Sequence, residues 1–151
     1  MFLEQDVVKS TQYCNQPAMI LTISEPYGEN LPDEEILKIF KNNSESEVIV
    51  ITGYDPIDEP DALRGFIFSA RKLFEPGDRP RIIIYTNYYN EELNKKFWSG
   101  LKAEFQHYGN VFLKYGRPSK KDKSMHFNPY LGIKLKGKDQ HVEVYTKLQH
   151  E

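Results

Sequence analysis

The sequence predicts an α/β fold, with a mostly parallel sheet and helices on its outer face. Three observations support this prediction. Short runs of aliphatic residues, many of them β-branched, alternate along the chain with segments whose apolar residues recur at helical spacing. The run at 48–51 is apolar at every position and the others nearly so, which is typical of strands buried on both faces of a parallel sheet. The links are short, so successive strands are expected to be neighbours joined by right-handed crossovers.

The first strand and helix lie between residues 19 and 40. Residues 19–23 form a β-branched run, and the Ser-Glu-Pro-Tyr-Gly segment at 24–28 is expected to turn the chain. Pro32 precedes a predicted helix over residues 33–40, whose acidic first turn suits the positive end of a helix dipole. This part of the chain is therefore predicted to run strand, turn, helix.

Two further units follow in the same order. The run Val-Ile-Val-Ile at 48–51 predicts a central strand, and residues 61–74 have helical spacing with one apolar face. The third strand is predicted at 81–85 and its helix at 91–105, where leucine and phenylalanine recur at helical intervals. Repetition of strand and helix is the pattern that a parallel sheet requires.

The last part of the chain departs from this pattern. Residues 111–115 predict a fourth strand, and the polar segment 116–125 interrupts the alternation. Two shorter strands are predicted at 130–133 and 142–145. The whole chain, residues 1–151, is expected to form a single domain, because a chain of this length suffices for one hydrophobic core.

Composition and charge exclude several classes of function. Twenty Lys and Arg against twenty-two Asp and Glu leave a net charge of −2, so nucleic-acid binding is not expected. No apolar run is long enough to cross a bilayer, and the amino terminus lacks the apolar stretch of a secretory signal, so we expect a cytoplasmic protein without a membrane partner. The single cysteine, Cys14, cannot form an internal disulfide or hold a metal cluster by itself. The four histidines lack ligand spacing, and no metal site is expected.

Ligands of parallel sheets bind where the strands end, so the loops after the predicted strands form the candidate site. The segment Thr52-Gly53-Tyr54-Asp55-Pro56 carries a hydroxyl, a flexible glycine and a carboxylate, which suit an amine or a diol ligand. Alternatively, this segment is a turn in which Asp55 caps its own backbone. The chain contains no phosphate-binding glycine motif and no nucleophile elbow.

Two further features leave their interpretation open. Tyr88 and Tyr89 follow the third strand, where they either cover a pocket or shield the edge of the sheet. The basic stretch 114–123 carries five cations and one acid among ten residues. It is either a solvated loop or a contact for a phosphate or an acidic protein surface.

Several short motifs occur in a fixed order from residue 48 onward. Val-Ile-Val-Ile-Thr-Gly-Tyr-Asp-Pro at 48–56 comes first, and Arg-Ile-Ile-Ile-Tyr-Thr-Asn-Tyr-Tyr-Asn-Glu-Glu at 81–92 follows. Phe-Leu-Lys-Tyr-Gly-Arg at 112–117 then precedes Leu-Gly-Ile-Lys-Leu at 131–135 and Gln140. In this series, which covers about two thirds of the chain, the sequence resembles the activating proteins of anaerobic ribonucleotide reductases, small members of the radical S-adenosylmethionine superfamily.

The resemblance implies a partial (β/α) barrel with a pocket for S-adenosylmethionine at the strand ends. In that family, the loop that corresponds to 52–56 holds the amino group of S-adenosylmethionine. The chain departs from the family pattern at Tyr54 and Asn87, where glycine is usual, and at Asp139, where asparagine is usual. The resemblance assigns the residual pocket to Thr52, Gly53, Asp55, Tyr85 and Thr86.

The cluster motif of the family is missing. After the first strand, family members carry a Cys-x-x-x-Cys-x-x-Cys motif, because three thiolates hold three irons of a four-iron cluster. Here the strand at 19–23 leads into Ser-Glu-Pro-Tyr-Gly-Glu-Asn at 24–30 without a cysteine, and Cys14 lies before that strand. Reductive cleavage of S-adenosylmethionine then lacks its electron source. No cofactor is therefore expected, and residual S-adenosylmethionine binding stays an open alternative.

Two hypotheses of function follow. The first is a non-catalytic, cluster-less relative of the activating proteins that binds a protein partner, with the anaerobic ribonucleotide reductase catalytic subunit as a candidate. The second is a small enzyme or binding protein that uses the residual S-adenosylmethionine or nucleotide pocket without radical chemistry, with Glu25 and Asp55 as acid and base groups. The partner-binding residues of the first hypothesis are Tyr88, Tyr89, Lys114 and Arg117.

The missing thiolates lead to a testable expectation. After anaerobic reconstitution with iron and sulfide, the purified protein should stay colourless and free of stoichiometric iron, because one cysteine cannot replace three thiolates. Visible absorption and iron analysis measure this, with Cys14→Ala as the control for adventitious binding. A brown protein with a full cluster in both wild type and Cys14→Ala would contradict the expectation.

Overall fold

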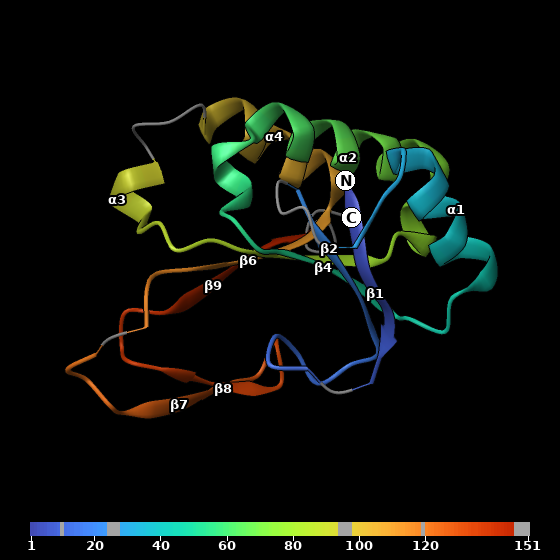
Figure 1. Cartoon of the computed structure of the whole chain (residues 1–151). Helices are drawn as coiled ribbons and strands as arrows, with labels where there is room; N and C mark the ends of the chain where they lie inside the picture. Colours follow the sequence, from blue (N-terminus) through green and yellow to red (C-terminus); the bar gives the residue numbers. More distant parts are fainter. Residues whose placement is uncertain (10, 24–27, 94–97, 119, 147–151) are drawn as a thin grey trace.

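A seven-stranded sheet forms the centre of the computed structural model. The structure describes residues 1–9, 11–23, 28–93, 98–118 and 120–146. Within these residues, the strand order of the sheet is β3-β1-β2-β4-β5-β6-β9 (Figure 1). The strands are β1 (Phe2–Val8), β2 (Ala18–Thr22), β3 (Glu29–Asn30), β4 (Val48–Thr52), β5 (Arg81–Tyr85), β6 (Asn110–Tyr115) and β9 (His141–Thr146).

The four central strands β2, β4, β5 and β6 pair in parallel. Ile20 lies opposite Val50, and Ile83 lies opposite Phe112. The outer strands β1 and β9 pair antiparallel with β2 and β6. Strands β2 and β4 are buried at every position, as expected for parallel strands that are covered on both faces. The predicted α/β fold with a mostly parallel sheet is confirmed.

Helices cover one face of the sheet (Figure 1). The covering helices are α1 (Asp33–Asn43), α2 (Pro60–Leu73) and α4 (Trp98–Tyr108), while the short α3 (Asn90–Leu93) lies at the end of the sheet. No helix in the described part of the chain is both long and apolar enough to cross a membrane. The side chains that α2 buries against the sheet are Leu63, Phe66, Ile67 and Ala70.

The sheet is open in the part of the chain that the structure describes. Its outermost strands, β3 and β9, pair only with β1 and β6, and not with each other. The structure therefore shows a mixed α/β sheet, and no barrel closes among these residues.

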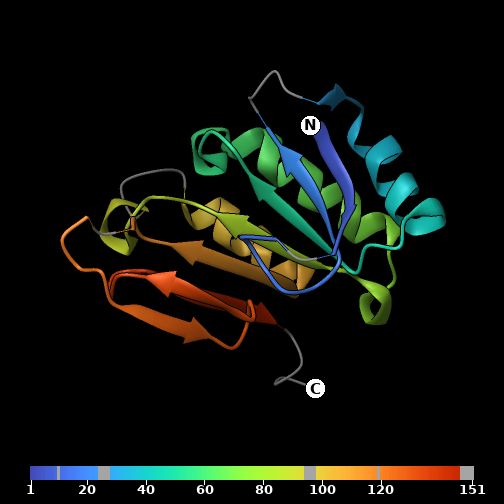
Figure 2. The same cartoon turned by 60° about the horizontal axis from the view of Figure 1, so that its bottom comes forward.

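A hairpin covers part of the opposite face of the sheet (Figures 1 and 2). It consists of the antiparallel strands β7 (Met125–Asn128) and β8 (Ile133–Lys136). Leu131 and Leu135 of the hairpin region join Phe112 of the sheet and the fully buried Cys14 in a second hydrophobic core. The molecule therefore has one core under the helices and a smaller core under the hairpin.

Two predicted elements are only partly matched by the described structure. The helix predicted over 91–105 is described only in part, as α3 and the first residues of α4, because residues 94–97 lie outside the described residues. The strand predicted at 130–133 was wrong, because residues 130–132 form a turn and the strand begins at Ile133. Asn128 stabilises that turn, since its Oδ1 accepts hydrogen bonds from the backbone N–H groups of Tyr130 and Leu131, both at 3.0 Å.

Other differences concern elements that the pattern did not reveal. Strands β1, β3 and β7 were not predicted. Strands β1 and β3 lack a clean alternation of apolar and polar residues, and β7 alternates over only four residues, a run too short to be distinctive. The turn predicted at 24–28 falls mostly on residues 24–27, which lie outside the described residues. The remaining predicted strands and helices are present within a few residues of their predicted ends.

The buried and the exposed face of helix α2 lead to a stability prediction. Phe66 is fully buried under the helix, whereas Phe68 on the same helix is 41% exposed. Phe66→Ala should lower the free energy of unfolding by about 3–5 kcal/mol, because it removes a buried ring and leaves a cavity. Phe68→Ala should cost less than about 1 kcal/mol, since Phe68 is partly exposed and its ring stacks on the surface cations of Arg71 and Lys72. Chemical denaturation of both variants measures the difference, and equal losses would contradict the assigned faces.

Candidate functional site

The candidate site lies at the carboxyl ends of the parallel strands, on the face opposite the helices. Side chains alternate between the two faces along a strand. Tyr85 therefore shares the face of Ile83, and Lys114 shares the face of Phe112. Tyr85 and Lys114 are register partners in β5 and β6. The strand pairing thus brings an aromatic ring and an amine side by side below the sheet.

A pocket of about 420 Å³ opens between these two side chains and the β7–β8 hairpin. The hairpin contributes the exposed residues Lys134 and Lys136 to its lining. Leu135, Ile133, Pro118 and Met125 add apolar surface to the wall. We call it the lysine pocket, and its principal polar lining residues are Tyr13, Tyr85, Lys114, Lys134, Lys136 and Gln140.

Lys114 is the most unusual residue of the lysine pocket. Its side chain is only 3% exposed, and its Nζ donates a hydrogen bond of 2.9 Å to the backbone oxygen of Gly116. The ammonium lies 5.4 Å from the centre of the Tyr85 ring. Burial lowers the pKa of Lys114 to about 8, and the charge of Asp55 opposes that shift. No carboxylate of the described chain forms an ion pair with Lys114.

Tyr85 forms part of the wall of the lysine pocket, and contacts with Tyr13 fix its position. Its hydroxyl donates a hydrogen bond of 2.7 Å to the backbone oxygen of Tyr13, and the two rings meet edge to face at 5.0 Å. Burial raises the pKa of Tyr85 well above its usual value. The phenol therefore stays neutral at physiological pH and acts as a fixed wall of the pocket.

Asp55 joins the loops that follow β4 and β5. Its Oδ1 accepts hydrogen bonds from the backbone N–H of Ile57 at 3.1 Å and from Thr86 Oγ1 at 2.8 Å. Its Oδ2 accepts from Thr86 Oγ1 at 2.9 Å and from the backbone N–H of Asn87 at 2.9 Å. Asp55 and Thr86, which the resemblance assigns to one residual pocket, are therefore in direct contact. The capping interpretation is confirmed, because Asp55 caps the short 3₁₀ helix η1 (Pro56–Asp58).

The remaining predicted pocket residues lie beside the lysine pocket without lining it. Thr52 ends β4 and is only 8% exposed, and Gly53 turns the chain with a positive φ of 91°. Tyr54 then places most of its ring in solvent, with 62% of its surface exposed. Among Thr52, Gly53, Asp55, Tyr85 and Thr86, only Tyr85 faces the pocket. Glu25, the other acid that we considered, lies outside the described residues.

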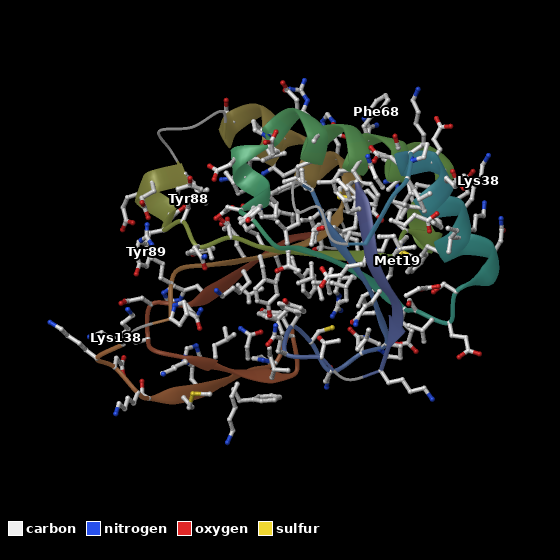
Figure 3. The ribbon with its side chains drawn as sticks, in the orientation of Figure 1. Met19, Lys38, Phe68, Tyr88, Tyr89 and Lys138 are labelled. Carbon is white, nitrogen blue, oxygen red and sulfur yellow. The ribbon has the colours of Figure 1, made fainter. Side chains whose placement is uncertain are left out.

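The predicted partner-binding residues separate into two groups. Tyr88 and Tyr89 lie beside α3 at the end of the sheet (Figure 3). The Arg117 guanidinium stacks 4.4 Å from the Tyr89 ring and binds both carboxylate oxygens of Glu92 at 2.8 Å. This hydrogen bonding also raises the pKa of Arg117. Lys114, by contrast, is buried and belongs to the lysine pocket. We call Tyr88, Tyr89 and Arg117 the docking edge.

A second concavity of about 420 Å³ adjoins the docking edge. Tyr115 and His141 contribute rings whose centres lie 5.6 Å apart, while Glu91 and Asp139 contribute carboxylates. Burial and the nearby carboxylates of Glu143 and Glu91 raise the pKa of Tyr115, so this phenol is also neutral. We call it the acidic pocket, and its lining residues are Tyr89, Asn90, Glu91, Tyr115, Asp139 and His141.

Sequence reasoning missed most of the lysine pocket. Lys134 and Lys136 alternate with Ile133 and Leu135, a pattern that indicates a strand with one basic and one apolar face. That signal was present in the sequence, but the strand was predicted a few residues too early. Nothing in the sequence around Tyr13 indicates that this residue lines a pocket. A group of three or more residues that could hold a metal ion does not occur among the described residues.

The buried amine of Lys114 predicts a pH dependence of stability. The pKa of about 8 in the folded chain lies below the ordinary value of 10.5, so the unfolded chain binds more protons between these values and stability rises with pH across this window. Lys114→Met removes the buried charge and should be more stable than wild type at pH 7, by ~1–3 kcal/mol. The advantage should shrink as the pH rises from 8 to 10.

Denaturation of wild type and Lys114→Met at several pH values measures this difference. Lys41→Met is the matched control, because Lys41 is exposed on α1. A Lys114→Met variant that is less stable than wild type at pH 7, with no change in the difference up to pH 10, would contradict the assignment.

Comparison of the chain with protein-family models, with the curated proteins and with the solved structures gives no match. Its function is therefore inferred from the order of its motifs and from the geometry of the lysine pocket, the acidic pocket and the docking edge.

Proposed function

We propose that the chain is a cluster-less relative of the activating proteins of anaerobic ribonucleotide reductases, and that it acts by binding a protein partner. The first three motifs that suggest this relationship lie on the central strands β4, β5 and β6 and in the loops that follow them, and the last lies in the β7–β8 hairpin and the segment before β9. These strands are parallel and are joined by helices on one face, an arrangement compatible with a fragment of a (β/α) barrel. The catalytic subunit of such a reductase is the first partner to test.

The chemistry of the side chains argues against a radical activity. Cys14 precedes β2, is fully buried, and directs its Sγ at the backbone oxygen of Gln16 at 3.5 Å. The segment after β2 contains no cysteine. Asp55, which stands in the loop that would hold the amino group of S-adenosylmethionine, already accepts hydrogen bonds from its own chain on both oxygens. The residues present therefore do not fit the cluster and its ligand, and no radical step is assigned to them.

The observation that favours a protein partner is that contacts within the chain hold the side chains and loops of the docking edge in fixed positions. Arg117 is held against the Tyr89 ring by Glu92, and Glu92 Oε1 also accepts the backbone N–H of Tyr89 at 2.9 Å. The backbone N–H of Gly116 donates to the backbone oxygen of Tyr88 at 3.0 Å, which fixes the end of β6 to the loop after β5. Aromatic and arginine side chains dominate protein interfaces, and side chains that are already ordered lose less entropy on binding.

The acidic pocket beside the docking edge suggests the chemistry of the partner. Glu91 and Asp139 contribute negative charge, and the Tyr89 and Tyr115 rings offer faces that attract cations. A lysine or arginine side chain of the partner suits this concavity. The partner surface is therefore expected to be basic where it meets the acidic pocket.

The proposal predicts the effect of truncating the docking edge. The triple variant Tyr88→Ala, Tyr89→Ala and Arg117→Ala should bind the purified reductase catalytic subunit at least about 30-fold more weakly than wild type. Loss of such anchors costs on the order of 2 kcal/mol or more. Binding is measured by interferometry with the subunit from the same cell, after circular dichroism has confirmed that the variant folds.

Phe68→Ala is the control for this experiment, since Phe68 is an exposed aromatic residue on the helix layer, away from Tyr88 and Tyr89 (Figure 3). It should bind like wild type. Equal affinity of the triple variant and wild type would move the interface elsewhere, and no affinity of wild type for the subunit would exclude this partner.

A second candidate function is a small enzyme or binding protein without radical chemistry. The lysine pocket is the observation that favours it, because a pocket of about 420 Å³ has the size of a small-molecule site. Its position at the carboxyl ends of β5 and β6 is where ligands of parallel sheets bind. Saturable binding or turnover of a small molecule, together with no affinity for the reductase subunit, would favour this second function.

A further inference from the structure

We propose that the lysine pocket binds a small organic anion, a carboxylate or a phosphate monoester carried on an aromatic or aliphatic body, with Lys114 as the principal anion ligand. The inference deepens the second candidate function and does not depend on the docking edge. It rests on a buried amine, on the charge of the pocket lining, and on the apolar wall that faces the amine.

The first argument is the imbalance of charge around Lys114. A buried ammonium is costly unless a counter-ion or several acceptors compensate it. Within the described chain, Lys114 has one hydrogen-bond acceptor, the backbone oxygen of Gly116. An ammonium has three donors, so two of them are left for a ligand. With a pKa of about 8, the amine is mostly protonated at pH 7 and carries the charge that an anion would neutralise.

The second argument is the sign of the charged groups around the pocket. Lys114 of β6 lines it, and Lys134 and Lys136 of β8 border it from the strand face opposite Ile133 and Leu135, while the described lining residues include no aspartate or glutamate. The nearest opposing charge identified is Asp55, whose oxygens are occupied by Ile57, Thr86 and Asn87. A cleft lined by one sign of charge with low-dielectric walls concentrates ions of the opposite sign.

The third argument is the composition of the remaining wall. The Tyr85 ring lies beside the amine, and Leu135 and Ile133 come from the hairpin opposite. Asn87 is exposed at the pocket, and the described chain shows no hydrogen bond from its side-chain amide. One end of the pocket therefore offers cationic and amide donors, while the walls offer apolar and aromatic surface. This division suits an amphipathic anion better than inorganic phosphate.

The same features disfavour S-adenosylmethionine as the occupant. Its sulfonium carries a positive charge, which the ammonium of Lys114 repels and the nearby Lys134 and Lys136 also disfavour. The carboxylate that would receive its amino group, Asp55, is already satisfied by Ile57, Thr86 and Asn87. The proposed ligand class therefore differs from the one that the sequence resemblance implies.

The experiment is a titration of isotopically labelled protein with four small probes, in which binding is measured from the NMR chemical shifts of the backbone amides. Phenyl phosphate and phenylacetate carry the proposed anionic groups, and benzyl alcohol and benzylamine are the neutral and cationic analogues. We expect saturable shifts around Tyr85, Lys114 and Gln140 with one or both anions, and at least about tenfold weaker binding of the two analogues. The anion that binds more tightly distinguishes a phosphate from a carboxylate ligand. Binding should weaken as salt is added.

Variants connect the binding to the lysine pocket. Lys114→Met should weaken binding of the preferred anion at least about tenfold, and Lys41→Met on the helix layer should leave it unchanged. Lys134→Met with Lys136→Met provides a second variant that changes only exposed side chains, and it should weaken binding about threefold or more. The docking-edge triple variant should bind the anion like wild type, so failure of the docking proposal and failure of this one are distinguishable.

Three results would overturn the proposal. If benzyl alcohol binds as tightly as the anions, the pocket is an apolar cavity without preference for negative charge. Undiminished anion binding by Lys114→Met and by the Lys134 and Lys136 double variant would place the anion elsewhere. The absence of saturable shifts with either anion up to the solubility limit would show that the pocket takes no ligand of this class.

Discussion

The rest of the structure depends on one constraint, the burial of the four parallel strands β2, β4, β5 and β6 on both faces. The helices cover one face, and the β7–β8 hairpin with the segment around Cys14 covers part of the other. At the carboxyl ends, this second cover leaves the lysine pocket open. Tyr85 and Lys114 line it because they continue the strand faces that carry Ile83 and Phe112 further inside.

Hydrogen bonds within the chain decide which polar groups at these strand ends are available. The Asp55 carboxylate accepts from Ile57, Thr86 and Asn87, so it joins two loops and is not free to bind a ligand. Lys114 has the opposite character, because it is buried with one backbone acceptor and no carboxylate of the described chain beside it. Asp55, which the motif marks as functional, has its hydrogen bonds satisfied within the chain. Lys114, whose charge lacks such compensation, lies on β6, two strands further along the sheet than β4.

The alternation of side chains along β6 separates two surfaces of opposite charge. Lys114 points below the sheet into the lysine pocket, and Tyr115, the next residue, lines the acidic pocket. The docking edge of Tyr88, Tyr89 and Arg117 lies next to the acidic pocket, where Tyr89 belongs to both. One strand end therefore presents a basic concavity suited to an organic anion and an acidic concavity suited to a basic partner surface, and the two proposed activities use different side chains.

The sequence by itself determined the fold class, because short, mostly apolar runs such as 48–51 and 81–85, alternating with helical segments, are local patterns typical of buried parallel strands. It also placed Asp55 and Thr86 in loops at the carboxyl ends of predicted parallel strands, which share one edge of the sheet and which the structure brings into contact. The tertiary structure alone decided the site. Whether Lys114 is exposed or buried depends on where the hairpin packs, and β8 borders the pocket of Lys114 only through that packing. Such contacts join residues far apart in the chain, and no local periodicity encodes them.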